Sequence, residues 1–140
     1  MIPHSSIFVL SGQVQSISML AHLTEQGVNG PFMVVGPLST LFNWQNEFKK
    51  WTPAMESIIY HGSKDTRKGI LGKHFRGKHS GFPVMITSYE IVIRDVKELK
   101  KINWKFVIID EGHRLKNMNC RVSSHPPAPI HRDSDCLCYG

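Results

Sequence analysis

The sequence lacks the features typical of disulfide-rich, membrane-spanning and secreted proteins. Its 140 residues include only three cysteines, Cys120, Cys136 and Cys138, crowded near one end, so we predict no disulfide framework. No apolar run approaches the roughly 18 residues that cross a bilayer. No lysine or arginine precedes Lys49, so the first residues lack the positive region of a secretory signal peptide. We therefore expect a protein of a reducing compartment with no membrane partner.

The positive charge is concentrated in the middle of the chain. The net charge is +6 overall, but residues 1–48 carry -2, residues 49–121 carry +9 and residues 122–140 carry -1. A local excess of this size suits a polyanion such as nucleic acid. It is equally compatible with the solvated face of a basic protein, and charge alone does not separate the two interpretations.

The hydropathy pattern predicts an α/β fold with a mostly parallel sheet flanked by helices. Short apolar runs predict strands over residues 32–35, 57–61, 84–87 and 106–109, with a short one possible within 5–10. Helical spacing predicts helices over residues 12–26, 39–51 and 88–101. Residues 62–81, with five glycines and six basic side chains, predict an exposed and mobile basic loop over at least part of their length. Residues 122–140 have three prolines and no periodicity, and predict a disordered tail.

Two adjacent carboxylates, Asp110 and Glu111, follow the last apolar run directly. Charges beside a low-dielectric core need a cation or hydrogen-bond donors. A Mg²⁺ ion carrying nucleotide phosphates would meet that need, because one carboxylate can hold the metal shell while the other acts on the attacking water. The competing interpretation is a strand that ends in a solvated acidic turn.

Three strings resemble motifs of the SWI/SNF-related, helicase-like ATPases. Residues 107–117 (VIIDEGHRLKN) resemble motif II, although Gly112 replaces the usual alanine. Residues 36–41 (GPLSTL), followed by NW at 43–44 and EF at 47–48, resemble motif Ia, and residues 86–90 (ITSYE) resemble motif Ib. Within this family the DEGH box, with YHG at 60–62 and WK at 104–105, is most similar to the lymphoid-specific helicase branch and its plant relative in DNA-methylation maintenance.

The resemblance implies a partial RecA-like lobe over residues 1–121 that uses ATP and Mg²⁺ on double-stranded DNA and nucleosomes in the nucleus. It implies that Asp110 coordinates Mg²⁺ through water and that Glu111 acts on the hydrolytic water. His113 would link the nucleotide site to the DNA-contacting motifs. The residues that would face DNA phosphates are Ser39 and Thr40 of motif Ia and Thr87 and Ser88 of motif Ib. Arg114 and Lys116 would contact DNA or cap the structure. Trp44 shares a helical face with Leu41, Phe48 and Trp51, which favours a core position over a base-stacking one.

Two parts of the family pattern are missing. No glycine-rich loop ending in lysine precedes the first helix, and the residues there are Ser11, Gly12 and Gln13. The second RecA-like lobe, with the arginines that reach the γ-phosphate, is also missing from this sequence. We therefore expect little or no ATP hydrolysis by this chain alone. Two alternatives remain: a non-catalytic fragment with salt-sensitive DNA affinity, and an inactive truncated product.

Overall fold

The structure is a computed structural model that describes residues 6–9, 12–76 and 83–111, the first of these ranges as main chain only. The described strands form one five-stranded sheet in the order β1-β5-β2-β4-β3, and every pairing is parallel. The strands are β1 (Ser6–Val9), β2 (Phe32–Gly36), β3 (Ser57–Ile59), β4 (Val84–Ser88) and β5 (Phe106–Ile109).

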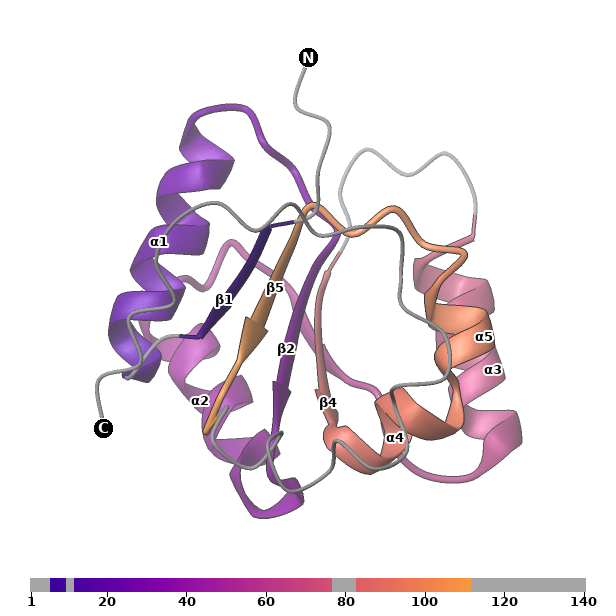
Figure 1. Ribbon diagram of the computed structural model, residues 1–140. Helices are drawn as coiled ribbons and strands as arrows, with labels where there is room; N and C mark the ends of the chain where they lie inside the picture. The colour runs from indigo at the N-terminus through magenta and orange to yellow at the C-terminus, as the bar shows by residue number, and fades with distance from the viewer. Residues whose placement is uncertain (1–5, 10–11, 77–82, 112–140) are drawn as a thin grey trace.

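Helices cover both faces of the sheet (Figure 1). One face carries α1 (Gln13–Glu25) and α2 (Leu41–Trp51), which pack against each other, and the other carries α3 (Lys64–His74), α4 (Tyr89–Arg94) and α5 (Val96–Leu99). A parallel sheet covered on both faces needs strands that are apolar throughout, and every residue of β2 and β4 is buried. The fold is therefore the α/β architecture expected from the sequence.

Alternate residues of each strand enter two separate cores, because successive side chains point to opposite faces. Val34, Ile86 and Ile108 pack under α1 and α2 with Ile17, Leu20, Leu41, Trp44 and Phe48. Met33, Met85 and Val107 pack under the other helices with Leu71, Phe75, Tyr89, Leu99 and Trp104. The strand register therefore determines which side chains reach each core.

Within residues 62–81, where we predict an exposed basic loop over at least part of the length, eleven residues form α3. Residues 77–81 lie outside the described residues, so the loop prediction is not tested there. The Ser63 side chain accepts a hydrogen bond from the Thr66 main-chain nitrogen, which caps the helix. Gly69 and Gly72 each have open space where a Cβ would lie, so they weaken the helix without marking its end. Leu71 anchors α3 in the core. Arg67 is also buried, at 3% exposed, although we predict exposed basic side chains in this stretch.

Two predicted helices differ in detail from the observed ones. The helix predicted over residues 88–101 is two short helices, α4 and α5, separated by Asp95. In α2 the predicted apolar face is buried at Leu41, Trp44 and Phe48, but Trp51 at its end is 52% exposed. The Trp51 indole instead donates to Glu47 at 2.7 Å, on the surface.

The described part of the chain contains no helix that is long and apolar enough to cross a membrane. The predicted tail at 122–140 lies outside the described residues, so that prediction is not tested.

Candidate functional site

The carboxyl ends of the parallel strands form one edge of the sheet, which is where open α/β sheets bind ligands. Asp110 lies at this edge immediately after β5. Its main-chain nitrogen donates to the Val35 carbonyl oxygen at 2.8 Å, so the ladder with β2 continues to Asp110. Its carboxylate Oδ2 accepts a hydrogen bond from the Trp44 indole Nε1 at 2.9 Å. Within the described ranges, no lysine, arginine or histidine lies within ion-pair distance of this carboxylate.

Glu111 follows in a backbone conformation that is rare for a residue with a side chain. Its φ is 52°, in the left-handed region, and it is the one described non-glycine residue with a positive φ. Asp110 and Glu111 lie in a turn directly after β5, and Glu111 is exposed. Strained residues of this kind concentrate at functional sites, where the surrounding structure holds them in place.

Gly36 ends β2 between Asp110 and the turn that follows β4. A Cβ at Gly36 would lie 3.3 Å from the Asp110 Cβ and 3.2 Å from the Thr40 Oγ1, both closer than ordinary contacts. Gly36 pairs with Ser88 on its other side. Glycine suits this position because the acidic residue and the turn after β2 approach the backbone closely, and a side chain here would have to displace them.

The turn after β2 is the predicted motif Ia, and its two hydroxyl residues, Ser39 and Thr40, have different surroundings. Residues Leu38–Thr40 form a short 3₁₀ helix that leads into α2. The Thr40 hydroxyl donates to the Pro37 carbonyl oxygen at 2.8 Å, and its main-chain nitrogen donates to the same oxygen at 3.0 Å. In this conformation Thr40 stabilises the turn and has neither group left to donate to a ligand, whereas Ser39 is exposed.

The turn after β4 is the predicted motif Ib, and its two hydroxyls point to different surroundings. The Thr87 hydroxyl is fully buried and donates to the Tyr60 carbonyl oxygen at 2.9 Å, so it is directed inward, away from any phosphate. Ser88 is 1% exposed, and its Oγ has no hydrogen-bond partner among the described residues. A buried hydroxyl without a partner costs about 1–3 kcal/mol.

An open groove of about 430 Å³ lies between these two turns. It is lined by Gly36, Pro37, Leu38 and Ser39 on one side and by Ser88, Tyr89 and Glu90 on the other. The structure thus brings predicted site residues from motifs Ia and Ib together, with Asp110 on the far side of Gly36.

The start of α1 lies where a phosphate-binding loop would be expected. Gly12 caps α1 with a φ of 115° and provides no side-chain cap. Asn43 of α2 donates to the Gln13 Oε1 at 2.7 Å, which links the starts of the two helices. Residues 12–25 contain no lysine or arginine.

Three other predicted site residues lie outside the described residues: His113, Arg114 and Lys116. Their predicted roles are untested. The described residues also contain no group of three or more histidine, cysteine or carboxylate side chains that could hold a metal by themselves. A divalent metal at Asp110 would therefore need oxygen ligands from a bound phosphate or water, as Mg²⁺ commonly has.

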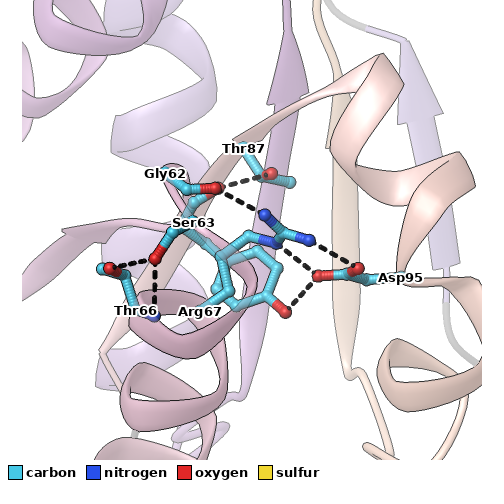
Figure 2. A network of polar contacts seen from close by, with 7 residues as sticks. Gly62, Ser63, Thr66, Arg67, Thr87 and Asp95 are labelled. Carbon is cyan, nitrogen blue, oxygen red and sulfur yellow. Dashed lines mark hydrogen bonds and ion pairs between the residues drawn. The ribbon is translucent and has the colours of Figure 1, made fainter.

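Sequence inspection missed a buried polar network behind motif Ib (Figure 2). Arg67 of α3 donates from Nε to the Asp95 Oδ2 at 2.6 Å and from Nη2 to Oδ1 at 3.0 Å. The Tyr60 hydroxyl donates to the same Oδ2 at 2.6 Å. Since Thr87 donates to the Tyr60 carbonyl oxygen, this network connects α3 and the joint between α4 and α5 to the strand that ends at Ser88.

The network shifts the pKa of each of its groups in the direction that favours the ion pair. The hydrogen bond from Arg67 holds the pKa of the Asp95 carboxyl below its usual range, against the opposing effect of burial. The hydrogen bond to Asp95 raises the pKa of Arg67. Burial, followed by the hydrogen bond to Asp95, raises the pKa of Tyr60 well above its usual value.

Comparison with known proteins identifies the family to which this fold and site belong. The family described as SNF2-related domain matches residues 10–128. The chain belongs to this family. It is 46% identical over 115 residues to the ATP-dependent DNA helicase DDM1 of Arabidopsis thaliana, covering 81% of this chain and 15% of that protein. It is 45% identical over 115 residues to the human lymphoid-specific helicase, covering 81% and 14%.

A solved structure supports the same assignment. The Sulfolobus solfataricus SWI2/SNF2 ATPase core in complex with dsDNA matches with a TM-score of 0.63 and 26% identity, over 82% of this chain and 22% of that one. The family and the α/β fold inferred from the sequence are thus confirmed. The chain spans about one seventh of the length of the two relatives above.

Proposed function

We propose that the carboxyl edge of this sheet is the nucleotide- and DNA-facing edge of an ATP-dependent DNA translocase that remodels chromatin. One observation carries the proposal: Gly36 has Asp110 on one side and the Ser88 turn on the other, so the acidic pair and the groove share one edge. Members of the same family carry names such as ATP-dependent DNA helicase and chromatin structure-remodeling complex subunit. The substrate of such a translocase would be nucleosomal DNA, and its location would be the nucleus.

Asp110 is the residue that would hold the Mg²⁺ of the nucleotide. Its carboxylate is half-buried and faces no cation within the described ranges, so it can accept one. Bound Mg²⁺ would neutralise the phosphates. Glu111, exposed and held by the turn at φ 52°, is the residue that would orient or deprotonate the attacking water. His113 would couple this pair to the DNA-facing turns.

The groove between motifs Ia and Ib would hold phosphates of double-stranded DNA. Ser39 is exposed on one wall, and Ser88 lines the other, with its hydroxyl buried and without a partner among the described residues. Contacts of this kind position the backbone without reading base sequence. Thr40 and Thr87 would act indirectly, since their hydroxyls hold the two turns in shape. Arg114 and Lys116 would add charge to the DNA side.

A charge-insertion experiment tests the DNA groove. The Ser39→Glu variant of the 140-residue chain places a carboxylate on the groove wall, and we expect at least about tenfold weaker binding of a short DNA duplex by fluorescence anisotropy, because one repelled phosphate contact costs over 1 kcal/mol. Ser18→Glu adds the same charge at an exposed position of α1 and is the matched control. Equal loss in both variants would show that charge alone matters and that the groove is not the site.

A second candidate function is DNA binding without turnover. It is favoured by the absence of any lysine or arginine before Lys49, which removes the phosphate-loop lysine, and by exposed Lys64, Lys68 and Lys73 along α3. In this case the chain binds DNA weakly and releases it as salt rises from about 50 to 200 mM, because phosphate contacts displace counterions. Affinity that is unchanged over this range would exclude it.

A further inference from the structure

Trp44 makes a contact that core packing does not require. Its side chain is 1% exposed and packs against Phe48, with ring centroids 6.3 Å apart. A phenylalanine could serve that purpose. The indole Nε1, however, donates to the Asp110 Oδ2 at 2.9 Å, although the two residues are 66 positions apart in the sequence.

Three constraints together hold Asp110 in one orientation. The main-chain nitrogen of Asp110 is bonded to the Val35 carbonyl oxygen, so its backbone is fixed to β2. On one side the Gly36 backbone lies so close that a Cβ added to it would be 3.3 Å from the Asp110 Cβ. The Trp44 indole fixes that same oxygen by hydrogen bonding. A carboxylate held by a second residue in this way is pre-organised for a ligand on its remaining oxygen.

The helix that carries Trp44 also carries the DNA-facing turn. Ser39 and Thr40 lie in the 3₁₀ segment that leads directly into α2, and Trp44 is on the first turn of that helix. Leu41, Trp44 and Phe48 anchor α2 firmly in the core. A displacement of the turn would therefore move the indole and the carboxylate it holds.

We propose that Trp44 is a positioning residue whose indole N–H orients the Asp110 carboxylate for a divalent cation and links that carboxylate to the DNA-facing turn through α2. The inference rests on the proposed function, in which Asp110 holds the metal. Partners that orient metal ligands typically contribute about 10- to 100-fold to metal affinity. Loss of the Trp44 indole N–H alone, with an aromatic ring kept in its place, should therefore weaken metal binding.

The first measurement uses the unaltered 140-residue chain with Mn²⁺ alone as the probe. Its three tryptophans give three indole ¹H–¹⁵N NMR signals, assigned by single Trp→Phe variants. We expect Mn²⁺ to broaden the Trp44 signal first, the Trp51 signal only at higher concentration, and the Trp104 signal least. Trp51 donates to the surface carboxylate of Glu47, and Trp104 donates to the Leu99 carbonyl oxygen, so they control for non-specific binding and for distance. Equal broadening of all three would overturn the inference.

The second measurement compares variants by titrating free Mn²⁺ with electron paramagnetic resonance. We expect Trp44→Phe to weaken Mn²⁺ affinity about tenfold or more, and Trp51→Phe, which removes an indole N–H to a carboxylate on the same helix, to leave it unchanged. Gly36→Ala, which crowds Asp110 without touching the indole, should weaken it as well.

Two outcomes separate the inference from the proposed function. If Asp110→Asn abolishes Mn²⁺ binding while Trp44→Phe does not change it, the proposed metal site stands and the role of Trp44 is wrong. If Asp110→Asn leaves Mn²⁺ affinity unchanged, both fail. If Trp44→Phe does not fold, the order in which Mn²⁺ broadens the three indole signals of the unaltered chain still tests the inference.

The link through α2 has its own test. We expect a saturating DNA duplex to change Mn²⁺ affinity at least about fivefold in the unaltered chain and in Trp51→Phe, since typical coupling free energies correspond to 5- to 150-fold. Trp44→Phe should reduce that ratio to near one. An equal ratio in all three proteins would show that Trp44 does not connect the two sites.

Discussion

Breaking the buried pair of Arg67 and Asp95 should remove a large share of the stability of this fold, because one charge would stay buried without its partner. Their side chains are 4% and 14% exposed, and both carboxylate oxygens of Asp95 accept from Arg67. Asp95→Asn keeps the size of the side chain but leaves the Arg67 charge buried without its counterion. Removing one partner of such a pair costs about 3–5 kcal/mol. We expect the free energy of unfolding at pH 7 to fall by about that amount.

The assay is urea unfolding of the 140-residue chain followed by circular dichroism. The matched control is Glu98→Gln, which breaks the surface pairs with Arg76 and Lys101, where the side chains are 38%, 66% and 67% exposed. Solvated pairs contribute little, so this variant should unfold almost as the unaltered chain does. In a double-variant cycle, Arg67→Met combined with Asp95→Asn should lose clearly less than the sum of the single losses.

The dependence on pH gives an independent check. Because the folded-state pKa of Asp95 is depressed, its stabilisation is complete above the unfolded pKa of about 3.9 and is lost as pH falls through the folded value. The difference between the unaltered chain and Asp95→Asn should therefore shrink below about pH 4. A loss at pH 7 of less than about 1 kcal/mol, or one that does not shrink in acid, would refute the reasoning.

Three further predictions follow from other parts of the structure. Tyr60→Phe should remove a dependence of stability on alkaline pH. Because the folded-state pKa of Tyr60 is raised, its stabilisation is complete below the unfolded pKa of about 10 and is lost as pH rises through the folded value. The melting temperatures of the two proteins should therefore converge in strong alkali. Gly69→Ala should stabilise the chain by about 0.5–1 kcal/mol in urea unfolding, since its Cβ meets open space on α3, whereas a loop there would give no gain. Steady-state ATP hydrolysis by the 140-residue chain with duplex DNA should equal that of Glu111→Gln, and robust turnover abolished by Glu111→Gln would contradict it.

The parts of the fold set by local pattern could be predicted from the sequence. Each strand of the sheet is a short apolar run, and the one at 106–109 ends at two acids, so Asp110 could be placed at a strand end without coordinates. Parallel pairing then follows, because helices separate the strands. The burial of Trp44 also followed from its spacing on α2.

The remaining features depend on contacts between distant residues. Asp95 is 28 residues from Arg67 and gives no local signal, so the sequence pattern does not predict that Arg67 is buried. The inward direction of the Thr87 hydroxyl depends on Tyr60, 27 residues away. Glycines usually indicate loops, but a serine cap and a buried leucine outweighed them in α3.

The central claim is that Asp110, next to Glu111, holds a divalent metal at the edge of the sheet shared with the groove. Fe²⁺ can replace Mg²⁺ at such a site and, with ascorbate and peroxide, cleave the backbone next to it, and the fragments can be mapped by mass spectrometry. The account predicts cleavage near residues 36–40 and 110–111 in the unaltered chain and its loss in Asp110→Asn. Cleavage confined to other segments, or unchanged in Asp110→Asn, would contradict it.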